Sequence, residues 1–413
     1  MLLIYNFGLL LYSALLRIFS LFHGKARLWV EGRKDWSTRL KQVWVNDGRP
    51  VAWFHAASLG EFEQAHPVIE AFKKEHPKYK IALTFFSPSG YEIRKNYSQA
   101  DWVGYMPMDT ARNAKAFLDI LQPTKAFFVK YEFWHHYTSE LKKRNIPTYM
   151  FSAIFRPSQS FFKPWGSFFR NILLRFDHIF LQDEDSALLL KDIGIENCTV
   201  CGDTRYDRVI EIAAQAKEIP LAASFQQSKP CIVVGSSWNE DLAVLLPLIN
   251  TFPHSLKVII APHEISESNL QYIEKHTPKK VVRFSKADRA TVGDFDILLI
   301  DNIGMLSSLY RYGDFAYIGG AFGKGLHNIL EAAVYGIPVF FGPSYTKFKE
   351  ATEMINTGAA FSVSSSEELK QKFTSLYDNV PLQNKLAVTA AGFVKSKAGA
   401  TPVILAHLNS VTV

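Results

Sequence analysis

From residue 50 onward, short apolar runs alternate with stretches in which apolar residues recur every three or four positions. Short apolar runs between helical stretches are typical of parallel strands joined by crossover helices, so the pattern predicts an α/β fold. In the first half the predicted strands are 51–56, 80–85, 102–105, 125–129, 148–151, 178–181 and 199–201, and the predicted helices include 62–75, 111–121 and 134–144.

A polar stretch at 213–230 interrupts this pattern, which then restarts. The predicted strands of the second half are 231–235, 257–261, 281–284, 297–301, 315–319 and 338–342, and the helices are 240–249, 266–276, 305–310, 329–335 and 347–355. We therefore predict two doubly wound, Rossmann-like domains, 50–212 and 231–413, joined by a linker at 213–230. Ligands of such sheets bind outside the carboxyl ends of the strands, here in the cleft expected between the domains. The last helical stretch is expected to pack back on the N-terminal domain.

The N-terminus departs from this alternation. Residues 2–22 carry one charge, Arg17, and as a helix they would extend about 31 Å, roughly one hydrocarbon core. The following segment, 23–49, is basic. We predict a membrane-anchor helix at 1–22 with the protein body on the cytoplasmic side. The sequence leaves open whether this helix spans the membrane or lies on it.

The composition indicates the class of protein, its redox compartment and the kind of partner it binds. Hydrophobic residues are 48% and charged residues 21%, as in ordinary globular proteins, and three cysteines indicate a reducing compartment. The net charge is +7, and residues 1–41 contribute +5 of it, from seven basic and two acidic residues. A basic excess beside an apolar segment favours a membrane surface over nucleic acid as the partner.

Four strand-to-helix loops carry candidate chemistry. The first contains Ser58, Gly60 and Glu61, directly after the strand at 51–56. Glu61 is either a first-turn acid favoured by the helix dipole or a general base at the mouth of the sheet. The second contains Lys130 and Glu132, after the strand at 125–129.

The third loop, 202–207, contains Arg205, which either binds a phosphate or carboxylate or pairs with Asp203 or Asp207. The fourth, 319–333, has glycines at 319, 320, 323 and 325, whose amides can surround an anion. The helix expected to begin near Asn328 offers its N-terminus to a phosphate, and Glu331 suits ribose hydroxyls.

With these residues, the chain resembles the 3-deoxy-D-manno-octulosonic acid (Kdo) transferases of lipopolysaccharide assembly, which are inverting glycosyltransferases of GT-B architecture. The resemblance covers nearly the whole chain. Its motifs are LWVEGRK at 28–34, HAASLGE at 55–61, TFFSPSG at 84–90, EFW at 132–134, GG at 319–320, HNILEAA at 327–333 and GP at 342–343.

The resemblance implies a role for particular residues. Glu61 corresponds to the family's proton acceptor, and Arg205 to a basic residue that stabilises the transition state. A family acid falls on Lys130, which leaves Glu132 as the candidate carboxylate of that loop. The cytidine monophosphate site corresponds to Pro262, His263, Ile303, Gly304, Met305, Asn328, Ile329, Leu330 and Glu331. Pro262 replaces an arginine of the family.

The implied reaction moves Kdo from CMP-Kdo to a lipid A precursor of the lipid IVA type, on the cytoplasmic face of the cell inner membrane, with Glu61 as base. We expect no cofactor, and no metal for transfer, because we identify no acidic metal-binding pair such as Asp-x-Asp in the chain. Two alternatives stay open. One is another GT-B enzyme, a UDP-sugar transferase or epimerase, and the other is a non-catalytic membrane protein that binds anionic lipid.

Overall fold

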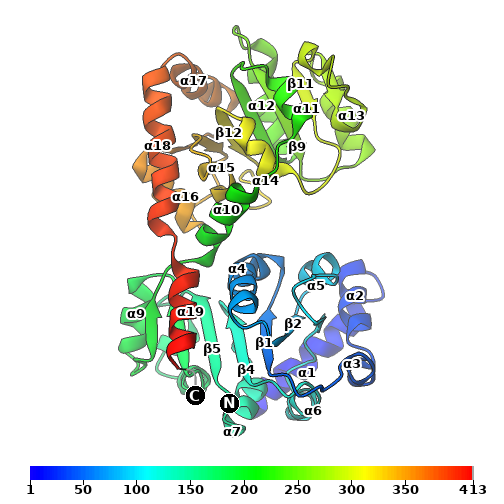
Figure 1. The fold of residues 1–413 in the computed structure, drawn as a ribbon, viewed down its shortest axis with the longest axis vertical. Helices are drawn as coiled ribbons and strands as arrows, with labels where there is room; N and C mark the ends of the chain where they lie inside the picture. The colour runs from blue at the N-terminus through cyan, green and yellow to red at the C-terminus, as the bar shows by residue number, and fades with distance from the viewer. Residues whose placement is uncertain (412–413) are drawn as a thin grey trace. The chain divides into compact units, whose positions relative to one another are not determined.

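The computed structural model describes residues 1–411, which form two compact units (Figure 1). Unit 1 consists of Met1–Arg208 together with the segment from Ala398 to the C-terminus, and unit 2 is Val209–Lys397. Each unit contains a seven-stranded sheet in which every pair of neighbours is parallel. The predicted α/β fold with two Rossmann-like domains is therefore confirmed.

Unit 1 is built on strands β1 (Val51–Ala56), β2 (Lys80–Phe85), β3 (Trp102–Tyr105), β4 (Lys125–Val129), β5 (Thr148–Ala153), β6 (His178–Leu181) and β7 (Cys198–Val200). Its helices are α1 (Leu2–Phe19), α2 (Gly24–Gly32), α3 (Trp36–Val43), α4 (Leu59–Glu75), α5 (Pro88–Arg94), α6 (Ala111–Leu121), α7 (His135–Lys143), η1 (Ser160–Phe162), α8 (Ser167–Leu173), α9 (Glu184–Lys191) and α19 (Ala400–Ser410). The strand order is β3-β2-β1-β4-β5-β6-β7. Because the order reverses between β1 and β4, the loops after these two strands border the crevice where such sheets bind ligands.

Unit 2 contains β8 (Cys231–Ser237), β9 (Lys257–Pro262), β10 (Val281–Arg283), β11 (Ile297–Leu299), β12 (Phe315–Ile318), β13 (Val339–Phe341) and β14 (Ala360–Ser362). Its helices are α11 (Pro220–Gln226), α12 (Asn239–Thr251), α13 (Glu267–Lys275), η2 (Phe284–Lys286), η3 (Val292–Asp294), α14 (Leu306–Leu309), η4 (Tyr310–Tyr312), α15 (Leu330–Ala333), α16 (Lys349–Thr357), α17 (Ser366–Tyr377) and α18 (Val380–Lys397). The strand order is β10-β11-β9-β8-β12-β13-β14, so here the order reverses between β8 and β12.

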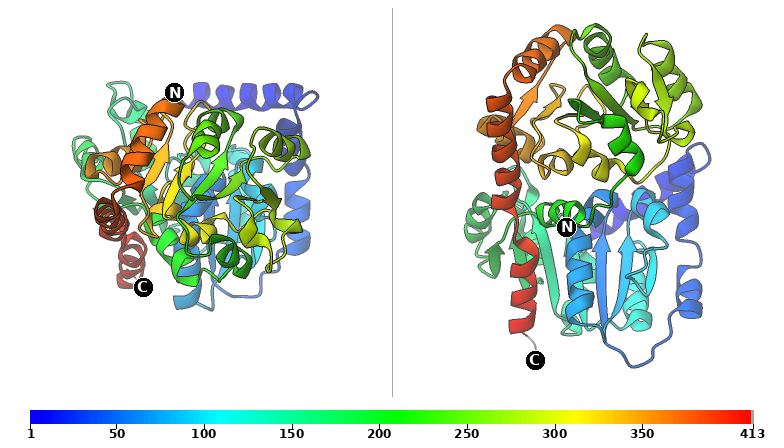
Figure 2. Two further views of the ribbon diagram at one scale, coloured as in Figure 1. Left: turned by 90° about the horizontal axis from the view of Figure 1, so that it is seen from above. Right: turned by 45° about the horizontal axis from the view of Figure 1, so that its top comes forward.

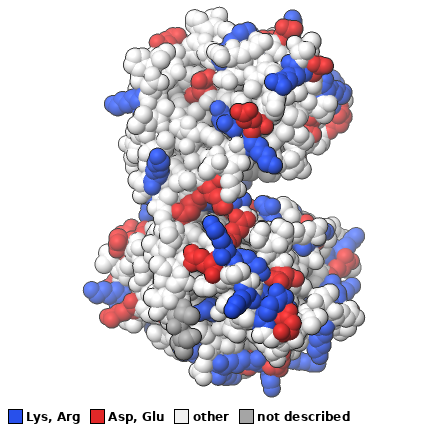
Figure 3. All heavy atoms as spheres, in the orientation of Figure 1, with Lys and Arg blue, Asp and Glu red and all other residues white. Residues whose placement is uncertain are grey.

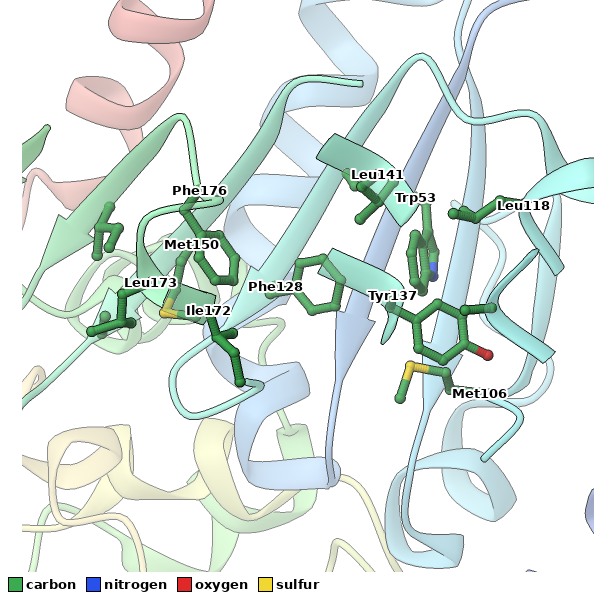
Figure 4. Packing of buried hydrophobic residues seen from close by; sticks show 14 of the residues in the cluster. Trp53, Met106, Leu118, Phe128, Tyr137, Leu141, Met150, Ile172, Leu173 and Phe176 are labelled. Carbon is green, nitrogen blue, oxygen red and sulfur yellow. The ribbon is translucent and has the colours of Figure 1, made fainter. Parts of the chain in front are cut away.

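The core of unit 1 follows the alternation of side chains along its strands. Trp53 and Phe128 belong to the cluster on one face of the sheet, and their neighbours Phe54 and Phe127 belong to the cluster on the other face. Figure 4 shows the first cluster, in which the Trp53 and Tyr137 rings lie 5.5 Å apart. Both faces of the sheet are therefore covered, and functional side chains are confined to its edges and loops.

The chain leaves unit 1 earlier than the sequence predicts and returns to it at the end. The division falls at Arg208, inside α10 (Thr204–Gln215), and α11 lies within the stretch interpreted as a linker. At the other end, α19 packs against α4, and its Ile404, Leu405 and Leu408 join the core of unit 1. The segment from Ala398 onward thus belongs to unit 1 and not to the second domain.

Asp207 holds the start of the C-terminal helix α19 against unit 1. One of its carboxylate oxygens accepts a hydrogen bond from the Gly399 amide (2.6 Å), and the other accepts one from the Thr401 amide (2.7 Å). These amides lie at the start of α19, where helix N–H groups lack partners within the helix. Asp207 therefore caps the N-terminus of α19.

Candidate active site

Glu61 lies in the first turn of α4, at the carboxyl edge of β1. Ser58 precedes the helix, and its hydroxyl donates a hydrogen bond to the Glu61 carboxylate but accepts none from the amides of the helix N-terminus. Glu61 is half-buried. Its carboxylate is therefore held by a neighbouring hydroxyl at the reversal point of the sheet, where a ligand would lie.

The two candidates after β4 have different surroundings. Lys130 has a left-handed backbone (φ 64°), and its ammonium lies 5.4 Å from the centre of the Tyr131 ring. Glu132 is buried beneath this edge, where it contacts His55 Nε2 (3.0 Å) and accepts a hydrogen bond from Trp134 Nε1 (2.6 Å). The candidate carboxylate Glu132 thus belongs to a buried network, which suits a positioning role better than direct contact with substrate.

Arg205 pairs with Asp203, which is the first of the two partners that the sequence allowed. Its Nε and Nη2 atoms lie 2.9 and 2.8 Å from Asp203 Oδ2. Asp203 also accepts a hydrogen bond from Gln64 Nε2 (3.0 Å), and the Thr204 hydroxyl donates to the Gln64 carbonyl (2.7 Å). Gln64 follows Glu61 by three residues on α4, so these bonds bring the Arg205 loop beside the Glu61 turn.

Charge on Asp203 is maintained by this pairing. Burial alone would raise the pKa of the Asp203 carboxyl, but the Arg205 guanidinium and the bonds to it hold that pKa below its usual value. The Arg205 side chain is 26% exposed. Arg205 therefore presents a fixed positive charge at the edge of the sheet.

A pocket of about 510 Å³ opens in unit 1 between the loop that follows β4 and the segment that follows β5. Phe133, Phe161 and Phe169 give it an aromatic wall, and Tyr131 and Arg156 supply polar groups. Burial raises the pKa of the Tyr131 hydroxyl, Arg156 opposes that shift, and the charges of Asp183 and Glu61 add to it. Tyr131, which lines the pocket, is thus within electrostatic reach of Glu61.

In unit 2, three rings stack at the carboxyl edge of the sheet. The His263 ring lies 4.4 Å from the Trp238 ring and 4.6 Å from the His327 ring, in both cases nearly parallel. Burial lowers the pKa of both histidines, that of His327 to about 4, so both rings are neutral at pH 7. The stack offers a flat, uncharged surface.

The glycine loop after β12 is shaped by a buried carboxylate. Asp241 accepts hydrogen bonds from the amides of Gly320 (2.9 Å) and Trp238 (2.9 Å) and from the Tyr317 hydroxyl (3.1 Å). Gly320 has φ 95°, and a Cβ there would lie 2.2 Å from the Gly325 carbonyl oxygen. Gly319 is equally restricted, because its Cβ would lie 2.3 Å from the Ser236 carbonyl oxygen. The paired glycines are therefore required by the close approach of the two loops.

The helix predicted at 329–335 is shorter than expected. Helix α15 comprises four residues, Leu330–Ala333, and Asn328 Oδ1 already accepts a hydrogen bond from the Leu330 amide (3.1 Å). One amide at the start of this helix is therefore occupied by Asn328, and the role of the helix N-terminus in binding a phosphate stays a prediction. Asn328 Nδ2 instead donates to Glu331 Oε1 (3.2 Å), which orients that carboxylate.

The other predicted nucleotide-site residues lie along the same edge. Pro262 ends β9, and Ile303, Gly304 and Met305 follow β11, with Ile303 92% exposed. Ile329 and Leu330 are buried, so their side chains are not available to a ligand.

A cavity of about 280 Å³ lies between Trp238, Pro262 and Lys324. The buried Ser237 hydroxyl also lines it and has no hydrogen-bond partner among residues 1–411. A buried polar atom without a partner is costly unless a ligand or water satisfies it. This cavity is therefore a good candidate for binding a polar group.

The expectation that transfer needs no metal was based on the lack of an Asp-x-Asp pair, and that basis is wrong. The four loops lack an Asp-x-Asp pair, but the chain contains two elsewhere, at 183–185 and 294–296. In the first, Asp183 Oδ1 accepts hydrogen bonds from the Ser186 amide (3.0 Å) and hydroxyl (2.6 Å), and in the second Asp296 accepts one from the Lys280 amide (3.0 Å). These aspartates have local structural roles, so neither triplet is by itself evidence for a metal.

Several site residues escaped the sequence analysis. Trp238 and Asp241 were missed because their importance lies in contacts with residues that are distant in sequence, such as His327 and Gly320. Arg156 was missed because it lies on an irregular segment after β5. A usable signal was the polar run SSWNED that follows the central strand at 231–235.

Comparison with known proteins agrees with these observations. A family model described as 3-Deoxy-D-manno-octulosonic-acid transferase (kdotransferase) matches residues 34–208. Among curated proteins, the 3-deoxy-D-manno-octulosonic acid transferase of Aquifex aeolicus (strain VF5) is 30% identical over 331 residues, which are 78% of this chain and 85% of that protein.

Two solved structures share the fold at low sequence identity. The UDP-GlcNAc 2-epimerase from Neisseria meningitidis, bound to UDP-GlcNAc, is similar with a TM-score of 0.61 and 16% identity over 87% of this chain and 100% of that one. MurG from Acinetobacter baumannii is similar with a TM-score of 0.56 and 13% identity over 88% of this chain and 100% of that one. The fold is accordingly the two-domain, Rossmann-like GT-B fold.

Proposed function

The chain belongs to the 3-deoxy-D-manno-octulosonic acid (Kdo) transferase family and is a glycosyltransferase, and we propose that it moves Kdo from CMP-Kdo to a lipid A precursor of the lipid IVA type with inversion at the anomeric carbon. The observation that carries this proposal is the position of Glu61. Glu61 lies in the first turn of α4, directly after β1, at the point where the strand order of the first sheet reverses.

In the proposed step, an acceptor hydroxyl attacks the anomeric carbon of Kdo while the bond from that carbon to the phosphate oxygen of CMP breaks. The hydroxyl proton passes to the Glu61 carboxylate, and CMP leaves with the bonding electron pair. General base catalysis of this kind contributes typically about 10²- to 10⁴-fold to the rate. The Ser58 hydroxyl supports the role by orienting the carboxylate.

Positive and polar groups are available to stabilise the negative charge of the transition state and to bind the donor nucleotide. Arg205, fixed by Asp203, would stabilise negative charge that develops in the transition state. On the donor side, the Ser237 hydroxyl and Lys324 line the cavity where we place the CMP phosphate, and Glu331 would accept hydrogen bonds from the ribose. The neutral stack of Trp238 and His263 would contact the cytosine ring.

Lys130 supplies a cation where the family resemblance implies an acid. Its ammonium is half-exposed beside Tyr131. We propose that it acts on a negatively charged group of a substrate, since the Kdo carboxylate and the phosphates of a lipid A precursor both carry such charge.

The direct experiment is to incubate the purified protein with CMP-Kdo and a tetraacylated lipid A precursor and to determine the product by mass spectrometry. We expect the lipid to gain the mass of one or more Kdo residues. A failure to transfer under conditions where a characterised Kdo transferase succeeds would contradict the proposal.

The alternatives are separated by binding. Calorimetry should show that CMP binds more tightly than UDP, and that Glu331→Gln weakens CMP binding by about tenfold or more. Preference for UDP would favour another GT-B enzyme. Binding of anionic lipid by a protein with no affinity for either nucleotide would favour a non-catalytic role.

A further inference from the structure

Helix α1 presents apolar side chains to the outside and several polar side chains to unit 1. Its partly covered positions recur every three or four residues and are Tyr5, Asn6, Leu9, Ser13 and Leu16. The opposite stripe is apolar and exposed, and includes Leu3 (83%), Phe7 (66%), Leu10 (65%) and Ile18 (58%). A surface helix in water has the reverse arrangement, with its apolar stripe toward the core. The outer stripe of α1 therefore requires an apolar surrounding.

The first turns of α1 are tied to unit 1 by polar contacts. The Tyr5 hydroxyl donates to Asp109 Oδ2 (2.5 Å), and Asn6 Oδ1 lies 2.7 Å from His136 Nε2. Asp109 is fully buried and also accepts hydrogen bonds from the amides of His136 (3.1 Å) and Tyr137 (3.0 Å). These bonds lie where a helix crossing a bilayer would need contact with hydrocarbon.

Contact between α1 and the unit continues along the helix, as the left view in Figure 2 illustrates with α1 extended at the margin beside α2. The Tyr12 ring meets the Trp29 ring edge-on at 5.9 Å, and Arg17 lines a groove shared with α2. From Tyr5 to Arg17 the helix extends about 18 Å.

If α1 spanned a bilayer in this conformation, the buried Asp109 carboxylate and the polar surface around it would enter the hydrocarbon core, which is strongly unfavourable. By length and composition alone the helix could span, with a mean hydropathy of 1.7. Its contacts favour a helix that lies flat.

The groove between α1 and the segment 29–36 has a volume of about 490 Å³. Leu9, Trp29, Trp36 and Met108 give it apolar walls, and Arg17 and Lys34 lie at its margin without an ion pair to any residue of 1–411. An apolar slot with two unpaired cations matches an acyl chain joined to a phosphate.

The surroundings of this groove are basic. Lys25, Arg27, Arg39 and Lys41 are exposed on or beside α2 and α3. Arg33 is the exception, since its guanidinium is buried and donates to the carbonyl oxygens of Met106 and Phe86. In Figure 3, Lys and Arg side chains are frequent on the visible face of the lower unit, which is unit 1. Exposed cations beside an apolar stripe are complementary to anionic lipid headgroups.

We propose that unit 1 binds an anionic bilayer through α1 lying in the plane of the membrane surface, and that the groove beside α1 holds one phospholipid, with an acyl chain between its apolar walls and the phosphate at Arg17 and Lys34. This inference does not rest on the proposed reaction, because its evidence lies in contacts of α1 and its tests measure topology and binding.

The orientation is tested by protease protection. The full chain with an epitope tag at its N-terminus is bound to sealed vesicles of phosphatidylethanolamine and phosphatidylglycerol, with the protein body outside, and protease is added outside. A helix that lies in the plane leaves the tag on the same side as the body, so we expect the tag to be digested. A tag protected until detergent is added would show a spanning helix and overturn the proposal.

The charge requirement is tested with vesicle sedimentation. The double variant Arg17→Gln, Lys34→Gln should bind phosphatidylglycerol-containing vesicles about tenfold or more weakly. A matched control is Lys275→Gln, Lys385→Gln, which removes two exposed cations of unit 2 and should bind as the unchanged protein does. An equal loss of vesicle binding in both double variants would show that binding depends only on the net charge of the protein. That result would overturn the role of Arg17 and Lys34.

The groove itself is tested by filling it. Ser13 lines the groove from α1, so Ser13→Phe should occupy the space of the acyl chain. After extraction from the same vesicles, native mass spectrometry should find one bound phosphatidylglycerol on the unchanged protein and none on the variant. Retention of the lipid by a folded Ser13→Phe variant would exclude the groove as its site.

Discussion

Two glutamates that look alike in the sequence have separate positions in the structure. Glu61 and Glu132 each come just after a strand of the first sheet. Glu61 is half-buried beside Ser58, whereas Glu132 is only 7% exposed and engaged by His55 and Trp134. Sequence position locates both near the edge, but which carboxylate is accessible depends on partners from other strands.

This difference leads to a prediction for Glu61→Gln. The amide cannot accept the acceptor proton, so we expect kcat to fall by about 10²-fold or more while the protein stays folded. Glu63→Gln is a matched control, because Glu63 lies on the same helix and pairs at the surface with Arg94. Steady-state transfer assays with CMP-Kdo check both variants. Near-normal turnover by Glu61→Gln would remove Glu61 from the role of base.

At the same scale, the sequence identified residues whose signal is local and missed those whose signal is distant. Ser58, Glu61 and the paired glycines 319 and 320 are visible as short motifs after apolar runs. Asp241 is not, because its function is to hold the Gly320 amide, which is 79 residues away. Its role depends on the adjacency of β8 and β12, which the order of residues does not reveal.

At the scale of elements, buried strands were the most predictable feature. Thirteen strands were expected within one or two residues of their observed bounds, because short apolar runs that alternate with helical stretches are typical of buried parallel strands. The fourteenth, β14 (Ala360–Ser362), was not expected. The helix expected at 329–335 is observed as the shorter α15, Leu330–Ala333.

Helix α19 should respond to acid. The His407 ring on α19 lies 4.0 Å from the His178 ring on β6. Burial, with a contribution from His407, lowers the pKa of His178 to about 4, and burial also lowers that of His407. Both values are below about 6.5, the value for an unfolded chain, so the neutral rings favour the folded state above pH 6.5. That stability is lost as the pH falls from about 6.5 toward 4.

Urea denaturation followed across this pH range checks the effect. We expect the midpoint for unit 1 to decrease with acid, and the decrease to be smaller in His407→Gln, which removes one titrating ring. His276→Gln serves as the control, because His276 is exposed and its ring stacks on Tyr272 in unit 2. The same pH dependence in all three proteins would show that the His178–His407 contact does not contribute.

At the scale of the whole molecule, charge was correctly assigned to a region but not to individual side chains. Residues 1–41 carry +5 of the net +7. The structure removes Arg33 from the surface, because burial beside three aromatic rings lowers the pKa of its guanidinium to about 9 and its donors bind carbonyl oxygens. A count of charges along the chain cannot distinguish a cation that meets solvent from one that supports a core.

Metal dependence is likewise a property of the complete enzyme. The proposed step uses Glu61 as base and Arg205 to stabilise negative charge, with no cation in either role, so we expect transfer to continue in excess EDTA. The measurement is the rate of Kdo transfer with EDTA, compared with the rate after magnesium is restored. A loss of activity that magnesium reverses would direct attention to the Asp183–Asp185 triplet, whose last two residues are exposed.

The return of the chain to unit 1 has a consequence for biosynthesis. The sheet of unit 1 is complete at Val200, but α19, which supplies Ile404, Leu405 and Leu408 to its core, begins only at Ala400. A ribosome makes the chain from the N-terminus, so all of unit 2 is synthesised while this face of unit 1 is still uncovered. The second unit can fold as soon as it emerges, whereas the first must wait for the end of translation. The unit that is made first is therefore the one that is finished last.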